Sequence, residues 1–169
     1  SAGSANFDFG GDVAEILIFD RKLSDTEDKQ IEGYLAHRWG ATDSLTLSHP
    51  YKELPPIFDN SPKLSPKPYV YPVGSVVGSW TPATIVGSSN FEVWYDANDS
   101  STITGTSTVS LWKDKSGNSY DAKSPVGSPA YVSNGGPGNM PTIRILRSAG
   151  VSNKCSLSVD GSIFAKEHY

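Results

Sequence analysis

Oxygen-bearing residues gather where two predicted strands of the second half end. Asp96, Asn98 and Asp99 follow one apolar run, and Asp114 follows the next. Carboxylate and amide oxygens of this kind are ligands for Ca²⁺. The spacing does not match the twelve-residue calcium loop, and Asx residues in turns often cap the backbone instead. Calcium, held through Asp96 and Asp99, is therefore the one cofactor that the sequence leaves open.

A second polar group has the residue types that bind sugars. Asp114, Asn118 and Tyr120 combine a carboxylate, an amide and an aromatic ring within seven positions. Aromatic faces stack on sugars, while amides and carboxylates bind the hydroxyl groups. Trp94 and Trp112 alternate with polar residues on predicted strands, which favours a place in the core. The first three residues are thus the candidate carbohydrate site.

Glycoside hydrolysis needs two carboxylates that flank the scissile bond, one as nucleophile and the other as acid/base. The best strand carries Glu15, with Asp12 on the opposite face, while Asp96 and Asp99 fall in a turn. There is no nucleophile elbow and no glycine-rich phosphate loop in the sequence. The sequence therefore indicates a non-enzymatic protein, with no catalytic residue assigned.

Composition narrows the class further. The 169 residues are 37% apolar, with 16 Gly and 12 Pro, as in polar, secreted-type β proteins. The net charge of -4 is spread along the chain without a basic stripe, which argues against nucleic-acid binding. No apolar run approaches the roughly 20 residues that span a bilayer, which argues against membrane insertion. One cysteine, Cys155, excludes an intrachain disulfide. Because Ser1 is not Met, we expect a piece of a longer polypeptide.

Residues 24–39 predict an amphipathic helix. Ser24 and Glu27 have the spacing of a capping box, and Gly40 supplies a stop signal. His37 is expected at the helix end and not as a metal ligand. The apolar face is formed by Ile31, Tyr34, Leu35 and Trp39.

Strand patterns lie on both sides of this helix. Residues 13–19 are apolar on both faces, which predicts one strand inside a sheet; Glu15 is expected to pair with Arg21 or Arg38. Eight of the 12 prolines fall at positions 50–82, which predicts an extended connector. Later strands are expected at 91–95, 109–112, 141–146 and 156–159, with a tight turn at 114–118 and a loop at 134–139.

Two stretches resemble a known module. AEILIFDRKLSDTEDKQIEGYLAHRWG, followed by LTLSHPYKELPP, resembles the C-terminal end of laminin-G-like modules of the concanavalin A-like lectin/glucanase superfamily. FEVWYDANDSSTIT, VSLWKDKSGNSYDA and the loop before MPTIRI resemble the N-terminal end of the same module type. The resemblance implies an all-β fold: a jelly-roll sandwich of two antiparallel sheets, repeated in tandem in bacterial surface and phage virion proteins.

The order of the two stretches suggests three regions. Residues 1–49 would be the tail of a first module, residues 50–88 the proline-rich connector and residues 89–169 an incomplete second module. The two pieces would either pair with each other or be completed by strands from outside this sequence or from a neighbouring subunit. The second outcome is the one that we expect.

The resemblance implies a non-enzymatic structural or adhesion protein, extracellular or on a cell or virion surface. Its partners would be other modules or subunits of the same assembly and cell-surface glycans. Two alternatives remain: a glycoside hydrolase or its accessory carbohydrate-binding module, and a purely architectural shell or fibre subunit.

Overall fold

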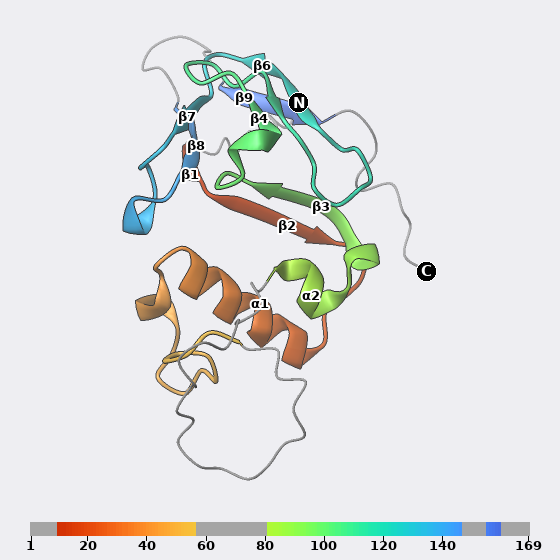
Figure 1. Ribbon diagram of the computed structural model, residues 1–169, viewed down its shortest axis with the longest axis vertical. Helices are drawn as coiled ribbons and strands as arrows, with labels where there is room; N and C mark the ends of the chain where they lie inside the picture. Colours follow the sequence, from red (N-terminus) through yellow and green to blue (C-terminus); the bar gives the residue numbers. More distant parts are fainter. Residues whose placement is uncertain (1–9, 57–80, 147–154, 160–169) are drawn as a thin grey trace, which may run out of the picture. The chain divides into compact units, whose positions relative to one another are not determined.

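The computed structural model describes residues 10–56, 81–146 and 155–159. The chain divides into two compact units. The first, which we call the β unit, combines residues 1–22 with residues 89–169; the second, the helical unit, is formed by residues 23–88. The β unit is therefore built from both ends of the sequence, which Figure 1 draws in red and in green to blue. The assignment of residues 1–49, 50–88 and 89–169 to successive modules stays a prediction.

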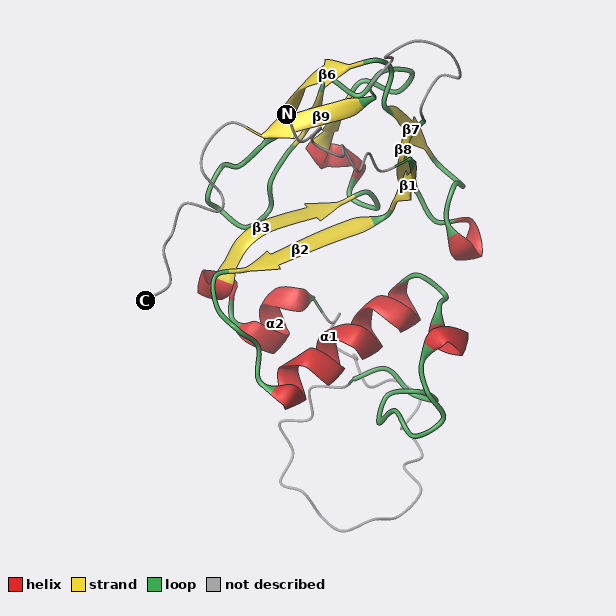
Figure 2. Ribbon diagram, turned by 180° about the vertical axis from the view of Figure 1, so that it is seen from behind, coloured by secondary structure: helices red, strands yellow, loops and turns green. Residues whose placement is uncertain are grey.

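Three antiparallel sheets make up the described part of the β unit (Figure 2). The first has the order β1-β8-β7, with β1 Gly11–Val13, β7 Ala130–Val132 and β8 Thr142–Ile145. The second pairs β2 Glu15–Phe19 with β3 Phe91–Asp96. The third has the order β4-β5-β6-β9, with β4 Ile103–Thr104, β5 Leu111–Trp112, β6 Ala122–Val126 and β9 Ser156–Val159. The expected β-rich, antiparallel class is confirmed.

The two ends of the chain pair with each other in the β unit. β1 pairs with β8, with Asp12 opposite Arg144, and β2 pairs with β3, with Leu17 opposite Trp94. The expectation that outside strands would complete each piece is thus wrong for these strands. The physical reason is that pairing gives β3 and β8 a partner and places Val13 and Ile18 against the core.

The single strand expected at 13–19 is two strands. β1 and β2 are separated at Ala14 and belong to different sheets. The Ala14 carbonyl still accepts a hydrogen bond from the Ala97 N–H at 2.9 Å, so the β2–β3 ladder continues by one bond past Asp96. Among the described strands β2 has one neighbour, β3, and it therefore lies at an edge, not inside a sheet as expected.

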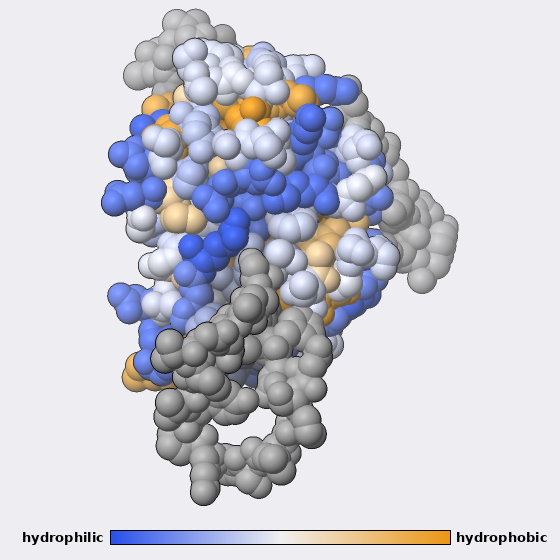
Figure 3. All heavy atoms as spheres, viewed as in Figure 1, coloured by the Kyte–Doolittle hydropathy of each residue, from blue (hydrophilic) through white to orange (hydrophobic). Residues whose placement is uncertain are grey.

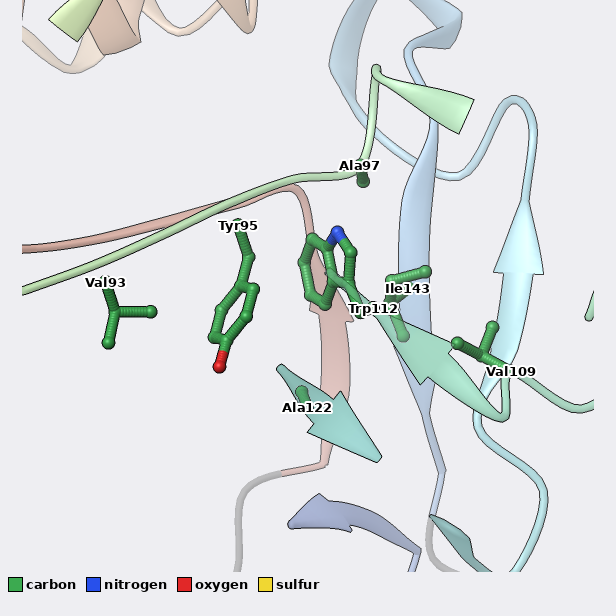
Figure 4. Packing of buried hydrophobic residues seen from close by; sticks show 7 residues of the cluster. All are labelled: Val93, Tyr95, Ala97, Val109, Trp112, Ala122 and Ile143. Carbon is green, nitrogen blue, oxygen red and sulfur yellow. The ribbon is translucent and has the colours of Figure 1, made fainter. Parts of the chain in front are cut away.

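One core joins the three sheets. Figure 4 shows the Tyr95 ring between Val93 and the Trp112 indole, with Ile143 on the far side of the indole. Trp112 is buried, as predicted, but Trp94 is only half-buried and lies outside this cluster. Successive side chains of a strand point to opposite faces, so Val93 and Tyr95 take the core face of β3 and Trp94 takes the other.

The strands predicted from apolar runs are present in the structure, whereas the more polar strands were not predicted. β5, β8 and β9 lie within predicted strands, and β3 covers the strand predicted at 91–95 but ends one residue later, at Asp96, which was expected in a turn. β4, β6 and β7 were not predicted. β6 contains Pro125, has a register shift between Lys123 and Val126 against β9, and places Ser124 at φ 53°. Such an irregular strand lacks the two-residue alternation that sequence reading relies on.

The helical unit contains the predicted helix. α1 spans Asp25–Arg38 with Ser24 as its N-cap. The predicted capping box is present: the Ser24 N–H donates to Glu27 Oε2 at 2.9 Å, and the Glu27 N–H donates to Ser24 Oγ at 3.3 Å. Gly40 follows the C-cap at φ 64°, a left-handed conformation that glycine adopts without strain.

α1 is covered on more sides than the predicted apolar face. Ile31, Tyr34 and Trp39 are buried as expected, whereas Leu35 is only half-buried. Gly33 is also buried, and it lies about 200° around the helix from Ile31. The residues after the helix return to cover this side: the His37 imidazole Nε2 lies 2.8 Å from the carbonyl oxygen of Tyr51.

The expected extended connector contains a helix. α2 spans Pro82–Val86, within the last part of the predicted 50–88 segment. Pro82 at the first helical position lacks an N–H that would be unpaired there anyway, which is why proline suits it. The connector residues 57–80 lie outside the described part of the chain. Short 3₁₀ turns at Thr42–Ser44, Ser88–Asn90, Ser100–Thr102 and Pro137–Asn139 complete the described elements.

Surface polarity agrees with the composition. Hydrophilic side chains, drawn in blue, cover much of the face seen in Figure 3, and hydrophobic ones form smaller patches. In the described ranges, every helix is too short or too polar to cross a membrane.

Candidate functional site

The predicted 114–118 turn is organised around the Asp114 carboxylate. Its Oδ1 accepts hydrogen bonds from the Trp94 N–H at 2.9 Å and the Ser116 N–H at 2.8 Å. Its Oδ2 accepts from the Ser116 hydroxyl at 2.6 Å and the Tyr120 N–H at 3.1 Å. Gly117 has φ 96°, a value that favours glycine. One side chain therefore closes the turn and attaches it to β3.

Asn118 attaches the other end of the turn to the same strand. Its Nδ2 donates to the carbonyl oxygens of Phe91 at 2.8 Å and Glu92 at 3.0 Å. Between these points, the Lys115 N–H donates to the Trp94 carbonyl at 2.8 Å. The turn thus hydrogen-bonds to the edge of β3 that faces away from β2, where a further strand would otherwise pair.

Lys115 brings the two candidate calcium ligands together. Its Nζ lies 3.1 Å from Asp96 Oδ2 and 2.9 Å from Asp99 Oδ2. The same ammonium lies 4.6 Å from the centroid of the Trp94 ring, within range of a cation–π interaction. The Asp96 side chain is 3% exposed, so this ion pair is shielded on its Asp96 side.

Hydrogen bonding sets the charge of this cluster. The Ser101 hydroxyl, 2.5 Å from Asp99 Oδ1, and the Lys115 ammonium together lower the pKa of Asp99. Burial opposes the charge on Lys115, but hydrogen bonds with Asp99 and Asp96 outweigh it and raise the pKa of the ammonium. Asp99 and Lys115 are therefore both charged at neutral pH.

Glu15 lies on the face of the β2–β3 ladder that carries Trp94. Its Oε1 accepts the Trp94 indole N–H at 2.9 Å, and it stands opposite Asp96 in the register. The sequence predicted that Glu15 is a partnered carboxylate, and the indole is a partner that was not foreseen. Trp94 consequently contacts charged residues on both sides, Glu15 at its N–H and Lys115 over its ring.

This geometry bears on the calcium prediction. Asp96 and Asp99 are brought together as expected, but a protein ammonium already lies between them. A Ca²⁺ ion takes six to eight oxygen ligands, so it would have to displace Lys115 and recruit further oxygens. In the described ranges, no group of three or more His, Cys, Asp or Glu side chains is placed to hold a metal ion.

The candidate sugar-binding residues also come together, and the Asp114 carboxylate and the Asn118 amide nitrogen bond to the protein. Asp114 and Asn118 make the hydrogen bonds that hold the turn to β3. Tyr120 packs against the core, and its carbonyl accepts a hydrogen bond from the Tyr95 hydroxyl. Carbohydrate binding by these three residues stays a prediction.

Three residues of this site were not assigned to it from the sequence: Lys115, Trp94 and Asp121. Lys115 and Trp94 are in different predicted elements, and only the attachment of the turn to β3 brings them together. Asp121, whose Oδ1 accepts the Asp114 N–H at 2.9 Å, had no assigned role. The recurrence of Asp at 114 and 121 around a Ser-Gly-Asn turn was the available signal for a turn held by carboxylates.

Comparisons with known proteins detect no relative of this chain. The chain matches no family model, and neither the curated proteins nor the solved structures include a detectable match.

Proposed function

We propose that this chain is a non-enzymatic structural or adhesion module of a cell-surface or virion protein, built on a laminin-G-like jelly-roll sandwich. The observation that carries the proposal is the antiparallel pairing of β2 with β3. β2 belongs to the stretch that resembles the closing end of such a module, and β3 to the stretch that resembles its opening end. Complementary ends of one module type are expected to pair in this way.

The contacts of the 114–118 turn favour architecture over ligand recognition. Both oxygens of Asp114 and the amide nitrogen of Asn118 already bond to the protein. A sugar would have to displace these hydrogen bonds, through which half-buried Asp114 and exposed Asn118 hold the turn to β3. A purely architectural shell or fibre role is therefore the second candidate, and it is supported by the same contacts.

The hydrolase alternative has one arrangement in its favour. Glu15 and Asp96 lie opposite each other on one face of the β2–β3 ladder, and a retaining glycosidase needs two neighbouring carboxylates. However, the Asp96 side chain is 3% exposed and forms an ion pair with Lys115. The Glu15 carboxylate accepts a hydrogen bond from the Trp94 indole N–H. A nucleophile must reach its sugar, so these contacts support a structural role for the pair.

A glycan array probed with and without calcium, together with a reducing-sugar assay on β-glucans, tests the proposal. We expect no sugar release and no calcium-dependent binding, and we expect antibodies against the chain to label intact source cells or particles. Calcium-dependent glycan binding that disappears in Asp99→Asn would establish a lectin instead. Sugar release that is lost in Glu15→Gln would establish the hydrolase. Failure of the antibody to label intact cells or particles would contradict the surface location.

A further inference from the structure

The loop between β7 and β8 contains an Asn-Gly pair, Asn134 and Gly135, which is the chain's one pair of this kind. The Asn134 side chain is exposed, and it makes no hydrogen bond to any part of the chain that the structure describes. Its amide carbon, Cγ, is therefore open to water and can turn toward the backbone nitrogen of Gly135. An asparagine side chain has the length to close a small ring with that nitrogen.

Position 135 has to be glycine because of its packing. A Cβ built there would lie 2.2 Å from Thr142 Oγ1, a distance that real Cβ atoms do not show, and 3.1 Å from Val132 Cβ. Thr142 is 2% exposed and lies within β8, so its side chain has little room to withdraw. The backbone nitrogen next to Asn134 is consequently not shielded by a side chain of its own residue. The fold thus keeps a glycine after Asn134.

The Gly135 nitrogen is weakly held. Its N–H donates to the Val132 carbonyl at 3.4 Å, beyond the roughly 2.7–3.2 Å of ordinary N–H···O bonds. Asn118 offers a comparison: its amide nitrogen donates to two carbonyls of β3 at 2.8 and 3.0 Å, and the next residue, Ser119, carries a side chain. Among the described asparagines, Asn134 is the one that combines an exposed, unbonded amide with a following glycine nitrogen.

We propose that Asn134 is a site of spontaneous deamidation. The Gly135 nitrogen loses its proton and attacks Asn134 Cγ. A bond forms between these two atoms, the bond from Cγ to Nδ2 breaks, and Nδ2 takes up a proton and leaves as ammonia. Water then opens the succinimide ring at either of its carbonyls, which leaves aspartate or isoaspartate at position 134. The reaction consumes water, needs no enzyme, and does not depend on the proposed surface role.

The isoaspartate product changes the loop more than the aspartate product does. Both add a negative charge, but isoaspartate also places an additional carbon in the main chain between residues 134 and 135. Gly135 packs against Thr142 and Val132, which lie opposite each other where β7 and β8 meet the loop. A longer main chain has to move Gly135 out of this contact. The modification should therefore loosen the β7–β8 end of the sheet.

Peptide mapping of the full chain by mass spectrometry tests the deamidation. The folded protein is incubated at physiological temperature, at neutral and at mildly alkaline pH, and is then digested. Cleavage at Lys123 and Arg144 leaves Asn134 and Asn139 in one peptide, so fragmentation of that peptide locates the change. We expect a gain of about 1 Da at Asn134, as a mixture of aspartate and isoaspartate. The gain should accumulate faster at the higher pH, because the attacking nitrogen must lose a proton.

Asn134→Gln is the matched control, because its longer side chain would have to close a larger and less favourable ring. The gain in mass should be lost at this position and stay the same at the other asparagines. If Asn134 gains mass no faster than Asn98, Asn118 and Asn139, the proposed site is wrong. If aspartate forms there without isoaspartate, the ring closure is refuted.

Asn134→Asp separates the added charge from the change in the main chain. Freshly prepared, this variant carries the charge on an ordinary main chain, so it should keep the urea midpoint of the unsubstituted chain. The isoaspartate form, separated by chromatography, should unfold at a lower urea concentration. Equal midpoints for the two would show that the Gly135 contact tolerates the longer main chain, and would refute the loosening of the sheet.

Discussion

Gly33 and Tyr51 are in direct contact across the helical unit. A Cβ built on Gly33 would lie 2.6 Å from the Tyr51 Cβ and 2.9 Å from its Cγ. In an isolated helix Gly→Ala stabilises by about 1 kcal/mol, but overpacking costs about 1–3 kcal/mol. We therefore expect Gly33→Ala to lower the free energy of unfolding of the full chain, measured by chemical denaturation with helix content as the signal.

A background substitution at Tyr51 checks this explanation. The closest atom is the Tyr51 Cβ, which alanine keeps and glycine removes. Gly33→Ala should therefore remain costly in a Tyr51→Ala background and become neutral or stabilising in a Tyr51→Gly background. An equal cost in both backgrounds would show that the Cβ contact is not the cause.

The helix was predictable because its signals are local. Ser24 and Glu27 are three residues apart and bond to each other, so the sequence contains the whole motif. The burial of Gly33 was not predictable, because it depends on Tyr51, which follows an irregular stretch. Amphipathic periodicity reports which side of a helix is apolar, but it does not report which chain segments return to cover the other sides.

We expect the Asp114 carboxylate to stabilise the β unit. Asp114→Ala leaves the Trp94 and Tyr120 N–H groups without their acceptor. Both residues are half-buried, so water replaces the lost acceptor in part, and we expect a loss of about 1–3 kcal/mol in the free energy of unfolding. Asp114→Asn keeps one acceptor oxygen and should lose less. Denaturation followed by tryptophan fluorescence measures both.

Lys113→Ala is the matched control for this turn. Lys113 lies beside Asp114, its side chain is exposed, and its backbone N–H bond to the Thr102 carbonyl does not depend on the side chain. Its substitution should change stability by less than about 0.5 kcal/mol. A comparable loss in Lys113→Ala and Asp114→Ala would mean that the turn tolerates no change, and would remove the special role given to the carboxylate.

Acid should destabilise the fold through Asp99 and Asp12. The pKa of Asp99 is lowered by Ser101 and Lys115, and that of Asp12 by its hydrogen bonds with Arg144. A lowered folded pKa gives stability that is present above the unfolded value of about 3.9 and is lost as pH falls through the folded value. We expect the urea concentration at the unfolding midpoint to decrease as the pH drops below about 4. Asp99→Asn and Asp12→Asn should each flatten this decline, and an unchanged profile in both variants would contradict it.

The pairing of distant segments explains what the sequence could not predict. Glu15 and Trp94 are 79 residues apart and Asp12 and Arg144 are 132 apart, and no local pattern links either pair. Apolar runs located β3, β5, β8 and β9, but strand register is decided by which edges meet. The residue types of the candidate site were therefore recognised, whereas their use within the fold became visible only once the 114–118 turn was placed on β3.

Lys115 gives the sharpest test of the charged cluster. Lys115→Met keeps an unbranched side chain over Trp94 but removes the ammonium that lies 3.1 Å from Asp96 Oδ2. Since the Asp96 side chain is 3% exposed, the loss of its cation should cost about 3–5 kcal/mol of unfolding free energy.

Adding Asp96→Asn to Lys115→Met removes the carboxylate charge that the Lys115 ammonium balanced and should restore part of that stability. Lys115→Arg, which keeps the charge, should lose less than Lys115→Met. If the double variant is no more stable than Lys115→Met, the cost arises from packing around Trp94, and the ion pair contributes little. Denaturation midpoints of the four full-length chains, including the unsubstituted one, distinguish these two causes.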